Sequence, residues 1–373
     1  MKENIRVIVS GGGTGGHIFP AISIANAIKE QQPSAQILFI GAEGRMEMQR
    51  VPDAGYEIKG LPICGFDRKN LLKNVKVLFK IWKSQRMAKK IIKDFKPDVV
   101  VGVGGYASGP TLNQAAAMGI PCLIQEQNSY AGVTNKLLAN KVAKVCVAYE
   151  GMERFFPADK IIMTGNPVRQ ALFETQSTKA EAKKLFGLDP DKPTILFVGG
   201  SLGARTVNES ILTHLDIIEK SNVQIIWQTG KYYSASIAEQ MKGKNIPNLY
   251  ISDFIKDMGT AYKAADLVVS RAGASSISEF CLLGIPVILV PSPNVAEDHQ
   301  TKNAMALVNK NAALFVKDAE AKDSLLALAI DTVDDESRLQ MLSKNILTLA
   351  LPDSARIIAD EVIKLANHNH SHS

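Results

Sequence analysis

The sequence lacks any hydrophobic run long enough to cross a membrane. A spanning helix needs roughly 20 consecutive apolar residues, and no stretch of the 373 residues approaches that length. The N-terminus, Met1 to Val9, has no apolar signal region and no small-residue cleavage site. We therefore expect a protein that stays in the cytoplasm.

Cysteine is scarce, and its spacing is not that of a metal site. The four cysteines, Cys64, Cys122, Cys146 and Cys281, lie far apart and form no CxxC pair. This spacing indicates neither a zinc site nor a disulfide framework. We interpret the four residues as small buried hydrophobes.

The net positive charge of the chain comes from one segment. The formal net charge is +6, yet residues 67–96 alone hold eleven Lys or Arg and two Asp. Such a segment predicts an anionic surface as a partner. The composition, 46% hydrophobic and 21% charged, is that of a folded globular protein. The length favours two domains of roughly 150 to 200 residues each.

Short runs rich in Val and Ile alternate with amphipathic helical stretches, which predicts parallel sheets with helices on both faces. Strands are expected at 6–10, 36–40, 99–103, 122–125 and 145–148, and in a second series at 194–198, 224–228, 249–252, 267–270 and 287–290. The turn-forming cluster 164–167 separates the two series. It places a first domain at 1–164 and a second at 165–351. A last helix should begin near Ser354, after the stop and cap at 351–353.

Glycine turns follow four of the predicted strands, at 11–16, 102–106, 199–203 and 271–275. At the carboxyl end of a parallel strand, such a turn lets backbone amides approach a phosphate. The first turn contains GxGxxG, and Glu43 follows the next strand, so a dinucleotide-binding dehydrogenase is one alternative. Four such turns in two domains favour instead a diphosphate donor held by one domain and an acceptor held by the other.

Seven segments of the chain together resemble the MurG family of lipid II-forming GlcNAc transferases, within glycosyltransferase family 28. They are GGGTGGHIFPA (11–21), GVGGYASGP (102–110), EQN (126–128), GNPVR (165–169), GGSLGAR (199–205), RAGASSISE (271–279) and EDHQTKNA (297–304). The resemblance implies an α/β protein of the GT-B fold, in which two doubly wound Rossmann-like domains face a central cleft. It also implies that the C-terminal helix, about 352–373, packs back on the first domain.

The resemblance implies an inverting, UDP-GlcNAc-dependent transferase. GlcNAc would pass to the C4 hydroxyl of MurNAc in undecaprenyl-diphospho-MurNAc-pentapeptide, lipid I, during peptidoglycan synthesis. The implied location is peripheral, on the cytoplasmic face of the inner membrane, with the cell-wall and division machinery as partners and no nucleic acid. Two alternatives stay open: a GT-B transferase to another lipid such as diacylglycerol, and a non-catalytic sugar-nucleotide-binding membrane partner.

The resemblance places the donor in the second domain. Glu279 is expected at the start of a helix, where its carboxylate would accept the ribose hydroxyls, and Arg169 is expected to meet the diphosphate charge. The other expected donor contacts are Thr14, Gly15, Gly16, Asn128, Ser201, Ile255, Ala274, Ser275, Ser276 and Gln300. No metal or cofactor is expected, because the only DxD, at 189–191, lies in a proline turn.

The first domain is expected to bind the acceptor. His17 directly follows Gly16 at the start of a helix, whose positive end favours a neutral ring that can accept a proton. We therefore predict His17 as the general base. Tyr106 and Glu126 lie in the other acceptor-side turns and are expected to position the acceptor hydroxyl and to share in proton removal.

A basic helix is predicted between Leu71 and Lys93. Its apolar residues cover an arc about 200° wide, more than the stripe of about 100° that a docked surface helix needs. They are Val75, Val77, Leu78, Phe79, Ile81, Trp82, Ala88 and Ile92, with Lys73, Lys76 and Lys80 on the neighbouring face. A solvated lysine face would leave Phe79 and Trp82 unexplained. We therefore predict a surface that lies on anionic lipid.

Overall fold

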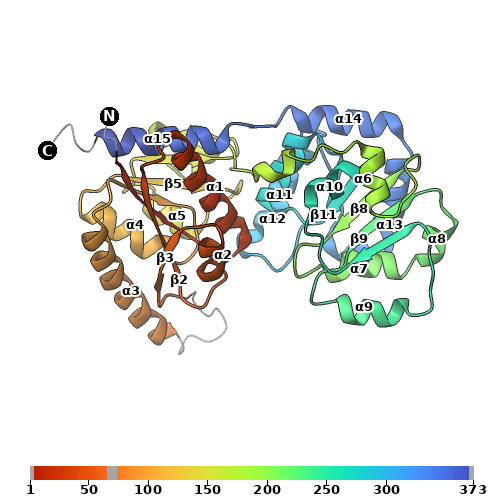
Figure 1. The fold of residues 1–373 in the computed structure, drawn as a ribbon, viewed down its shortest axis with the longest axis horizontal. Helices are drawn as coiled ribbons and strands as arrows, with labels where there is room; N and C mark the ends of the chain where they lie inside the picture. Colours follow the sequence, from red (N-terminus) through yellow and green to blue (C-terminus); the bar gives the residue numbers. More distant parts are fainter. Residues whose placement is uncertain (1–3, 65–73, 369–373) are drawn as a thin grey trace. The chain divides into compact units, whose positions relative to one another are not determined.

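The computed structural model describes residues 4–64 and 74–368, and the chain divides into two compact units. The first comprises Met1–Val168 and Leu351–Ser373, and the second Arg169–Ala350 (Figure 1). The sequence places the boundary after residue 164, within the same turn-rich segment. No helix in the described part of the chain has the length and apolar character needed to span a bilayer.

The first unit contains one parallel sheet in the order β3-β2-β1-β4-β5-β6-β7. Its strands are β1 (Arg6–Ser10), β2 (Gln36–Ala42), β3 (Glu57–Leu61), β4 (Val99–Gly102), β5 (Cys122–Glu126), β6 (Lys144–Val147) and β7 (Ile161–Met163). Val7 pairs with Ile37 on one side and with Val99 on the other. The strand order therefore reverses at β1, and the carboxyl ends of β1 and β4 form the switch point at which doubly wound sheets bind ligands.

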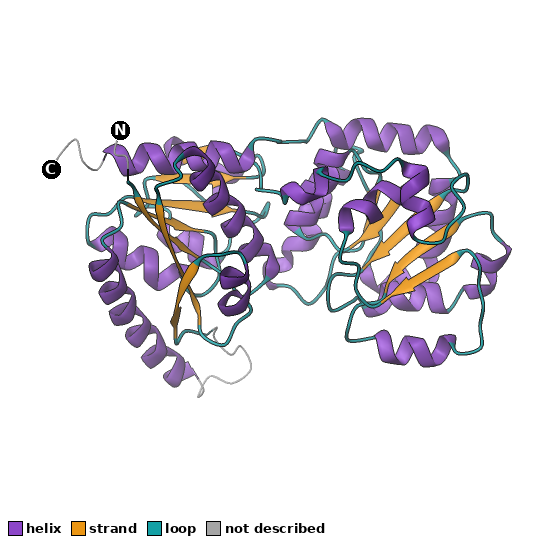
Figure 2. Ribbon diagram, viewed as in Figure 1, coloured by secondary structure: helices purple, strands orange, loops and turns teal. Residues whose placement is uncertain are grey.

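Helices cover both faces of this sheet (Figure 2). They are α1 (Gly15–Gln31), α2 (Glu47–Asp53), α3 (Asn74–Phe95), α4 (Ser108–Ala117), α5 (Val133–Leu138) and α15 (Ser354–His368). On one face, Ile358 and Val362 of α15 share a core with Ile24 of α1. On the other face, Ile92 of α3 packs with Leu112 of α4. The last helix of the chain is thus built into the first unit, beside α1 (Figure 1).

The second unit repeats this plan with the order β10-β9-β8-β11-β12-β13, again all parallel. The strands are β8 (Thr194–Val198), β9 (Gln224–Gln228), β10 (Leu249–Ser252), β11 (Leu267–Ser270), β12 (Val287–Leu289) and β13 (Leu314–Phe315). The helices are α6 (Lys179–Leu185), α7 (Arg205–Leu212), α8 (Leu215–Lys220), α9 (Ser234–Met241), α10 (Met258–Ala264), α11 (Ala274–Leu283), α12 (His299–Val308), α13 (Asp318–Val333) and α14 (Glu336–Leu347). Short 3-10 turns lie at Gln170–Phe173 and Ala296–Asp298 in this unit and at Met152–Arg154 and Ala158–Lys160 in the first. In the second sheet the strand order reverses at β8.

The two parallel sheets confirm the predicted α/β fold with two doubly wound domains, and each predicted strand is present. The prediction missed β3, β7 and β13. All three lie toward the edges of their sheets, and two of them span only two or three residues.

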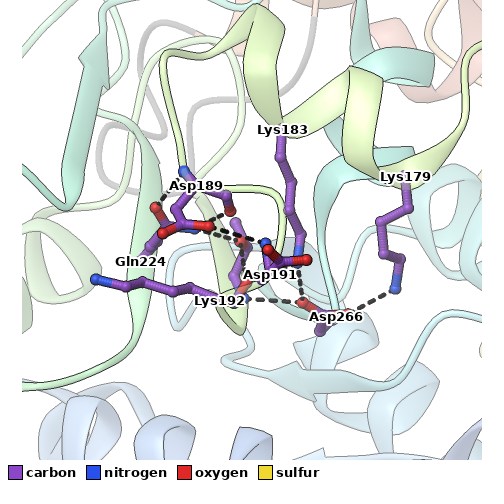
Figure 3. A network of polar contacts seen from close by, with 8 residues as sticks. Lys179, Lys183, Asp189, Asp191, Lys192, Gln224 and Asp266 are labelled. Atoms are coloured by element: carbon purple, nitrogen blue, oxygen red, sulfur yellow. Dashed lines mark hydrogen bonds and ion pairs between the residues drawn. The ribbon is translucent and has the colours of Figure 1, made fainter.

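A polar network ties α6 to the amino-terminal end of the second sheet (Figure 3). Lys183, whose side chain is 4% exposed, donates to the Lys192 carbonyl at 2.6 Å and to Asp266 Oδ2 at 3.0 Å. Lys179 and the Thr194 amide also donate to Asp266. Burial raises the pKa of this carboxyl, but the bonds and charge of Lys179 and the bonds from Thr194 and Lys183 outweigh it and leave the pKa below 3.8. Asp266 directly precedes β11, so the network lies opposite the glycine turns.

Candidate active site

The two glycine turns of the first unit contact each other at the switch point. The Gly12 amide donates to the Gly104 carbonyl at 3.3 Å, which joins the ends of β1 and β4. The His17 ring lies against the second turn, because a Cβ at Gly104 would lie only 2.8 Å from His17 Cδ2. Gly104 also has a φ of +91°. The fold thus brings His17 to the turn that carries Tyr106, whose side chain is exposed.

His17 is held in one orientation by its own turn. Its Nδ1 lies 3.1 Å from the Gly12 carbonyl oxygen and 3.2 Å from Thr14 Oγ1. A carbonyl only accepts, so the contact with Gly12 is a hydrogen bond when Nδ1 carries the proton, and the Thr14 hydroxyl can accept from the same group. We therefore assign the tautomer in which Nε2 carries the lone pair. This is the form that a general base requires.

Glu126 shapes a loop in this structure. It is buried at the end of β5, and its two oxygens accept from the Asn128 amide at 3.0 Å, the Gly132 amide at 3.0 Å and Asn135 Nδ2 at 2.8 Å. Asn128 Nδ2 is a fourth donor at 3.4 Å. A carboxylate has about four acceptor positions. This geometry fits a residue that holds the loop after β5 better than one that removes a proton.

Glu279 lies in the second turn of α11, and not at the start of a helix as the sequence suggested. Its Oε1 accepts from Arg169 Nε at 3.1 Å and from Nη2 at 2.9 Å. Its Oε2 accepts from the Tyr262 hydroxyl at 3.0 Å. Burial raises the pKa of Glu279 above 4.5 although Arg169 and Tyr262 oppose the rise. The pKa of Tyr262 is well above 10.0, because that residue is buried beside Glu279.

The predicted donor turns meet at the switch point of the second sheet, since β8 and β11 are neighbours. Ser201 is exposed in the turn after β8, and Ala274, Ser275 and Ser276 begin α11 after β11. Within the described ranges, Ser275 Oγ is buried without a hydrogen-bond partner. A buried hydroxyl without a hydrogen-bond partner is a feature of sites in which a bound ligand completes the hydrogen bonding.

Two further predicted residues already have partners within the protein. The Ile255 amide donates to Gln228 Oε1 at 3.0 Å, and Gln300 Oε1 accepts from the Ser292 amide at 2.8 Å. The second bond fixes the side-chain oxygen of Gln300 as the acceptor toward Ser292, so the side-chain nitrogen is the group that Gln300 could offer as a donor to a ligand. Glu297 and Asp298, just before Gln300, have φ of 57° and 49°. Non-glycine residues rarely adopt this conformation, and such strain clusters at functional sites.

The remaining predicted donor residues lie in the first unit. Thr14 precedes α1, Gly15 and Gly16 are its first residues, and Asn128 belongs to the loop held by Glu126. The donor set of the sequence prediction is thus divided between the two units.

Helix α3 divides its apolar residues between the core and the surface. Val77, Ala88 and Ile92 are buried, whereas Phe79 is 65% and Trp82 54% exposed. Leu78 and Lys80 are exposed as well. The Phe79 and Trp82 rings lie 5.8 Å apart, and the Arg86 guanidinium lies 4.8 Å from the Trp82 ring centre. Lys73 lies outside the described residues, as do the side chains of Val75 and Lys76.

The DxD motif makes a turn in this structure. The Asp191 amide donates to Asp189 Oδ1 at 3.0 Å, and the Asp189 amide donates to Gln224 Oε1 at 2.7 Å (Figure 3). Across residues 4–64 and 74–368, no group of three or more His, Cys, Asp or Glu is arranged to hold a metal ion. Asp189 and Asp191 therefore serve the connection into β8.

Two doubly wound sheets in one chain, each with glycine turns at its switch point, are the architecture of the GT-B fold. Residues 7–147 match the glycosyltransferase family 28 N-terminal domain, and residues 194–357 match the glycosyltransferase family 28 C-terminal domain. The chain belongs to the MurG family within glycosyltransferase family 28.

Relatives and solved structures match over almost the whole chain. The UDP-N-acetylglucosamine–N-acetylmuramyl-(pentapeptide) pyrophosphoryl-undecaprenol N-acetylglucosamine transferase of Phocaeicola vulgatus is 69% identical over 369 residues, 98% of each chain. The protein of the same name from Porphyromonas gingivalis is 55% identical and covers 98% of this chain and 97% of its own. The crystal structure of Acinetobacter baumannii MurG is 30% identical, with a TM-score of 0.75 over 96% of this chain and 99% of that one.

Proposed function

We propose that this protein transfers GlcNAc from UDP-GlcNAc to the C4 hydroxyl of MurNAc in lipid I, giving lipid II and UDP. The observation that carries the proposal is the identity of 55 to 69% over 98% of the chain to transferases named for this reaction. Diacylglycerol as acceptor has no comparable support. A non-catalytic role is disfavoured because His17 and Glu279 are both present and both held in place.

The second domain is proposed to bind the donor. The Glu279 carboxylate would accept the ribose hydroxyls, and Arg169 would move from Glu279 to the diphosphate. Arg169 suits this exchange because its side chain is 38% exposed and its planar guanidinium matches a phosphate as well as a carboxylate. Ser275 and the glycine turn after β8 would supply further hydrogen bonds. The charge that develops on the leaving UDP would meet Arg169 and backbone amides, so the proposal needs no metal.

The first domain is proposed to bind the acceptor, with His17 as the base. The C4 hydroxyl would lose its proton to His17 Nε2 while its oxygen attacks the anomeric carbon of GlcNAc. The bond from that carbon to UDP breaks, and its electron pair leaves with UDP. A single displacement of this kind inverts the anomeric configuration. Tyr106, exposed in the neighbouring turn, would help to orient the acceptor.

His17→Ala tests this assignment. General-base catalysis contributes typically about 10² to 10⁴-fold, so kcat should fall by that order while donor affinity stays near normal. Turnover would be measured with UDP-GlcNAc and a lipid I analogue, and donor affinity by calorimetry. Near-normal turnover would remove His17 from the mechanism. A collapse of acceptor affinity with the same loss of kcat would make His17 an acceptor-binding residue.

The exposed face of α3 is proposed to hold the enzyme on the cytoplasmic leaflet, close to its lipid-linked acceptor. Phe79 and Trp82 would enter the interface. Lys83, Arg86 and Lys90, which line the same open groove, would face anionic headgroups. Attachment to the cell-wall and division machinery is a further proposal that rests on the family resemblance alone.

A further inference from the structure

Glu47 is a buried carboxylate that the proposed reaction does not use. It is the first residue of α2 and is 1% exposed. Its Oε1 accepts from the Ala42 amide at 3.0 Å, and its Oε2 accepts from the Gly13 amide at 2.9 Å. The first glycine turn closes tightly over it, because a Cβ at Gly12 would clash with Oε1. Glu47 therefore lies directly beneath the turn that carries His17.

One peptide group joins Glu47 to His17. The N–H of the Gly12–Gly13 peptide donates to Glu47, and the C=O of the same peptide accepts from His17 Nδ1 at 3.1 Å. Hydrogen bonds in such a chain polarise one another, so a carboxylate on the N–H makes the carbonyl a stronger acceptor. The carboxylate of a Ser-His-Asp triad acts on its histidine in the same sense, but by direct contact.

We propose that Glu47 is a positioning residue for the transfer reaction, acting on His17 through the Gly12–Gly13 peptide. It fixes the Nδ1–H tautomer of the ring and stabilises the imidazolium that forms when Nε2 takes the proton of the acceptor hydroxyl. The Nδ1 proton stays in place throughout. The catalytic part of this inference rests on the proposed function, whereas the effect of Glu47 on the His17 tautomer does not depend on it.

The same contact bears on the GxGxxG sequence that a dehydrogenase would share. In dinucleotide-binding domains, the glycines of this turn bring backbone amides to a pyrophosphate. Here Glu47 already occupies the Gly13 amide and adds negative charge beneath the turn. The Gly13 amide is therefore already used within the protein, unlike the amides that a dinucleotide-binding turn offers to a pyrophosphate.

The test combines ring-nitrogen NMR of ¹⁵N-histidine-labelled protein with steady-state kinetics. In the wild type we expect His17 as the Nδ1–H tautomer. In Glu47→Gln we expect a mixture of tautomers and a kcat reduced roughly 10- to 100-fold, less than the loss of a directly bonded triad carboxylate because one peptide intervenes. KM for both substrates should change little. In a His17→Ala background, Glu47→Gln should bring no comparable further loss of kcat.

Asp98→Asn is the matched control. Asp98 is also buried and accepts a backbone amide, that of Arg6 at 2.8 Å, at the amino-terminal end of the same sheet. This variant should lose thermal stability but keep the His17 tautomer and kcat. An Nε2–H tautomer in the wild type would overturn the proposal even if Glu47→Gln did not fold. An unchanged tautomer and kcat in folded Glu47→Gln, or an equal kcat loss in Asp98→Asn, would overturn it as well.

Near-normal turnover of His17→Ala would instead overturn the base assignment of the proposed function and, with it, the catalytic part of this inference. The ring-nitrogen spectra still decide whether Glu47 sets the tautomer, since they require no turnover.

Discussion

Replacing Glu279 with Gln removes a charge from the proposed donor site while nearly preserving its shape. The carboxylate, 5% exposed, lies between Arg169 and the Tyr262 hydroxyl. The single oxygen of Gln can still accept from Arg169. Its amide group then faces Tyr262, whose hydroxyl can turn to accept. We therefore expect a folded protein whose site keeps its shape but whose Arg169 has lost its carboxylate partner.

The loss of donor affinity follows from the strength of charge-assisted hydrogen bonds. Such bonds contribute about 1.5 to 3 kcal/mol each and are roughly twice as strong as neutral ones. If Glu279 accepts two ribose hydroxyls, exchanging a carboxylate for an amide should cost about 1.5 to 3 kcal/mol in total. Because about 1.4 kcal/mol is a factor of ten, Kd for UDP-GlcNAc should rise roughly 10- to 100-fold.

Calorimetry with UDP-GlcNAc and its 2′-deoxyribose analogue measures this effect. The wild type should bind the deoxy donor clearly less well than UDP-GlcNAc, and the Gln variant should discriminate much less. Normal donor affinity in a well-folded Glu279→Gln would refute the reasoning. It would show that the carboxylate only holds Arg169 and Tyr262 in place.

The same substitution should change how the stability of the protein depends on pH. Since the pKa of Glu279 is raised above 4.5, the folded state binds this proton more tightly than the unfolded state. Its contribution is fully present below about pH 4.5 and is lost as the pH rises through the folded pKa. Gln does not titrate. Denaturant unfolding should therefore show the wild type losing free energy of unfolding relative to Glu279→Gln as the pH rises above about 4.5 and through the folded pKa. A constant difference would contradict the burial argument.

Three other predictions concern regions outside the donor pocket. Asp266→Asn should lower the free energy of unfolding at neutral pH by about 3 kcal/mol, because it leaves the buried Lys183 without its carboxylate. Since the pKa of Asp266 is lowered from 3.8, this difference should persist down to about pH 3.8 and shrink as the pH falls further, through the folded pKa. Donor affinity by calorimetry should stay normal. Phe79→Ser with Trp82→Ser should reduce sedimentation with anionic vesicles but not turnover of a short-chain soluble acceptor; unchanged vesicle binding would remove the membrane assignment. Activity should survive a chelator followed by desalting, and a loss restored by Mg²⁺ would contradict the metal-independent mechanism.

The fold could be predicted in detail because buried parallel strands have a simple sequence pattern. Runs such as Val99–Gly102 and Leu267–Ser270 are buried throughout and begin with three apolar residues, since helices cover both of their faces. Strand β3 was missed because Glu57 and Lys59 interrupt its apolar residues at the sheet edge. Strands β7 and β13 are too short to show any period.

The candidate site was predictable only where one continuous segment builds it. The glycine turns and His17 follow directly from the chain, and Glu279 from its motif. Tyr262 and Glu47 were missed because each lies on a separate helix and reaches its partner only in the folded chain. The one available signal for Glu47 was a carboxylate between two methionines, Met46 and Met48, in a short helix. For Glu126 the motif was visible but the role was not. Nothing in the motif revealed that four donors from residues 128–135 bond to its carboxylate.

A buried carboxylate lies by a glycine turn in each domain, and the difference between the two bears on which substrate each domain receives. Glu47 is held by two backbone amides, and exposing these to a ligand without a substitute would cost about 1 to 3 kcal/mol for each unpaired group. Glu279 is held by the buried Tyr262 hydroxyl and by Arg169, whose side chain is 38% exposed and can rotate to a new partner. The first site is thus fixed before any substrate binds, as a base aimed at one hydroxyl requires. The second has an internal ion pair that could be exchanged for contacts to ribose and diphosphate, as the proposed donor site requires.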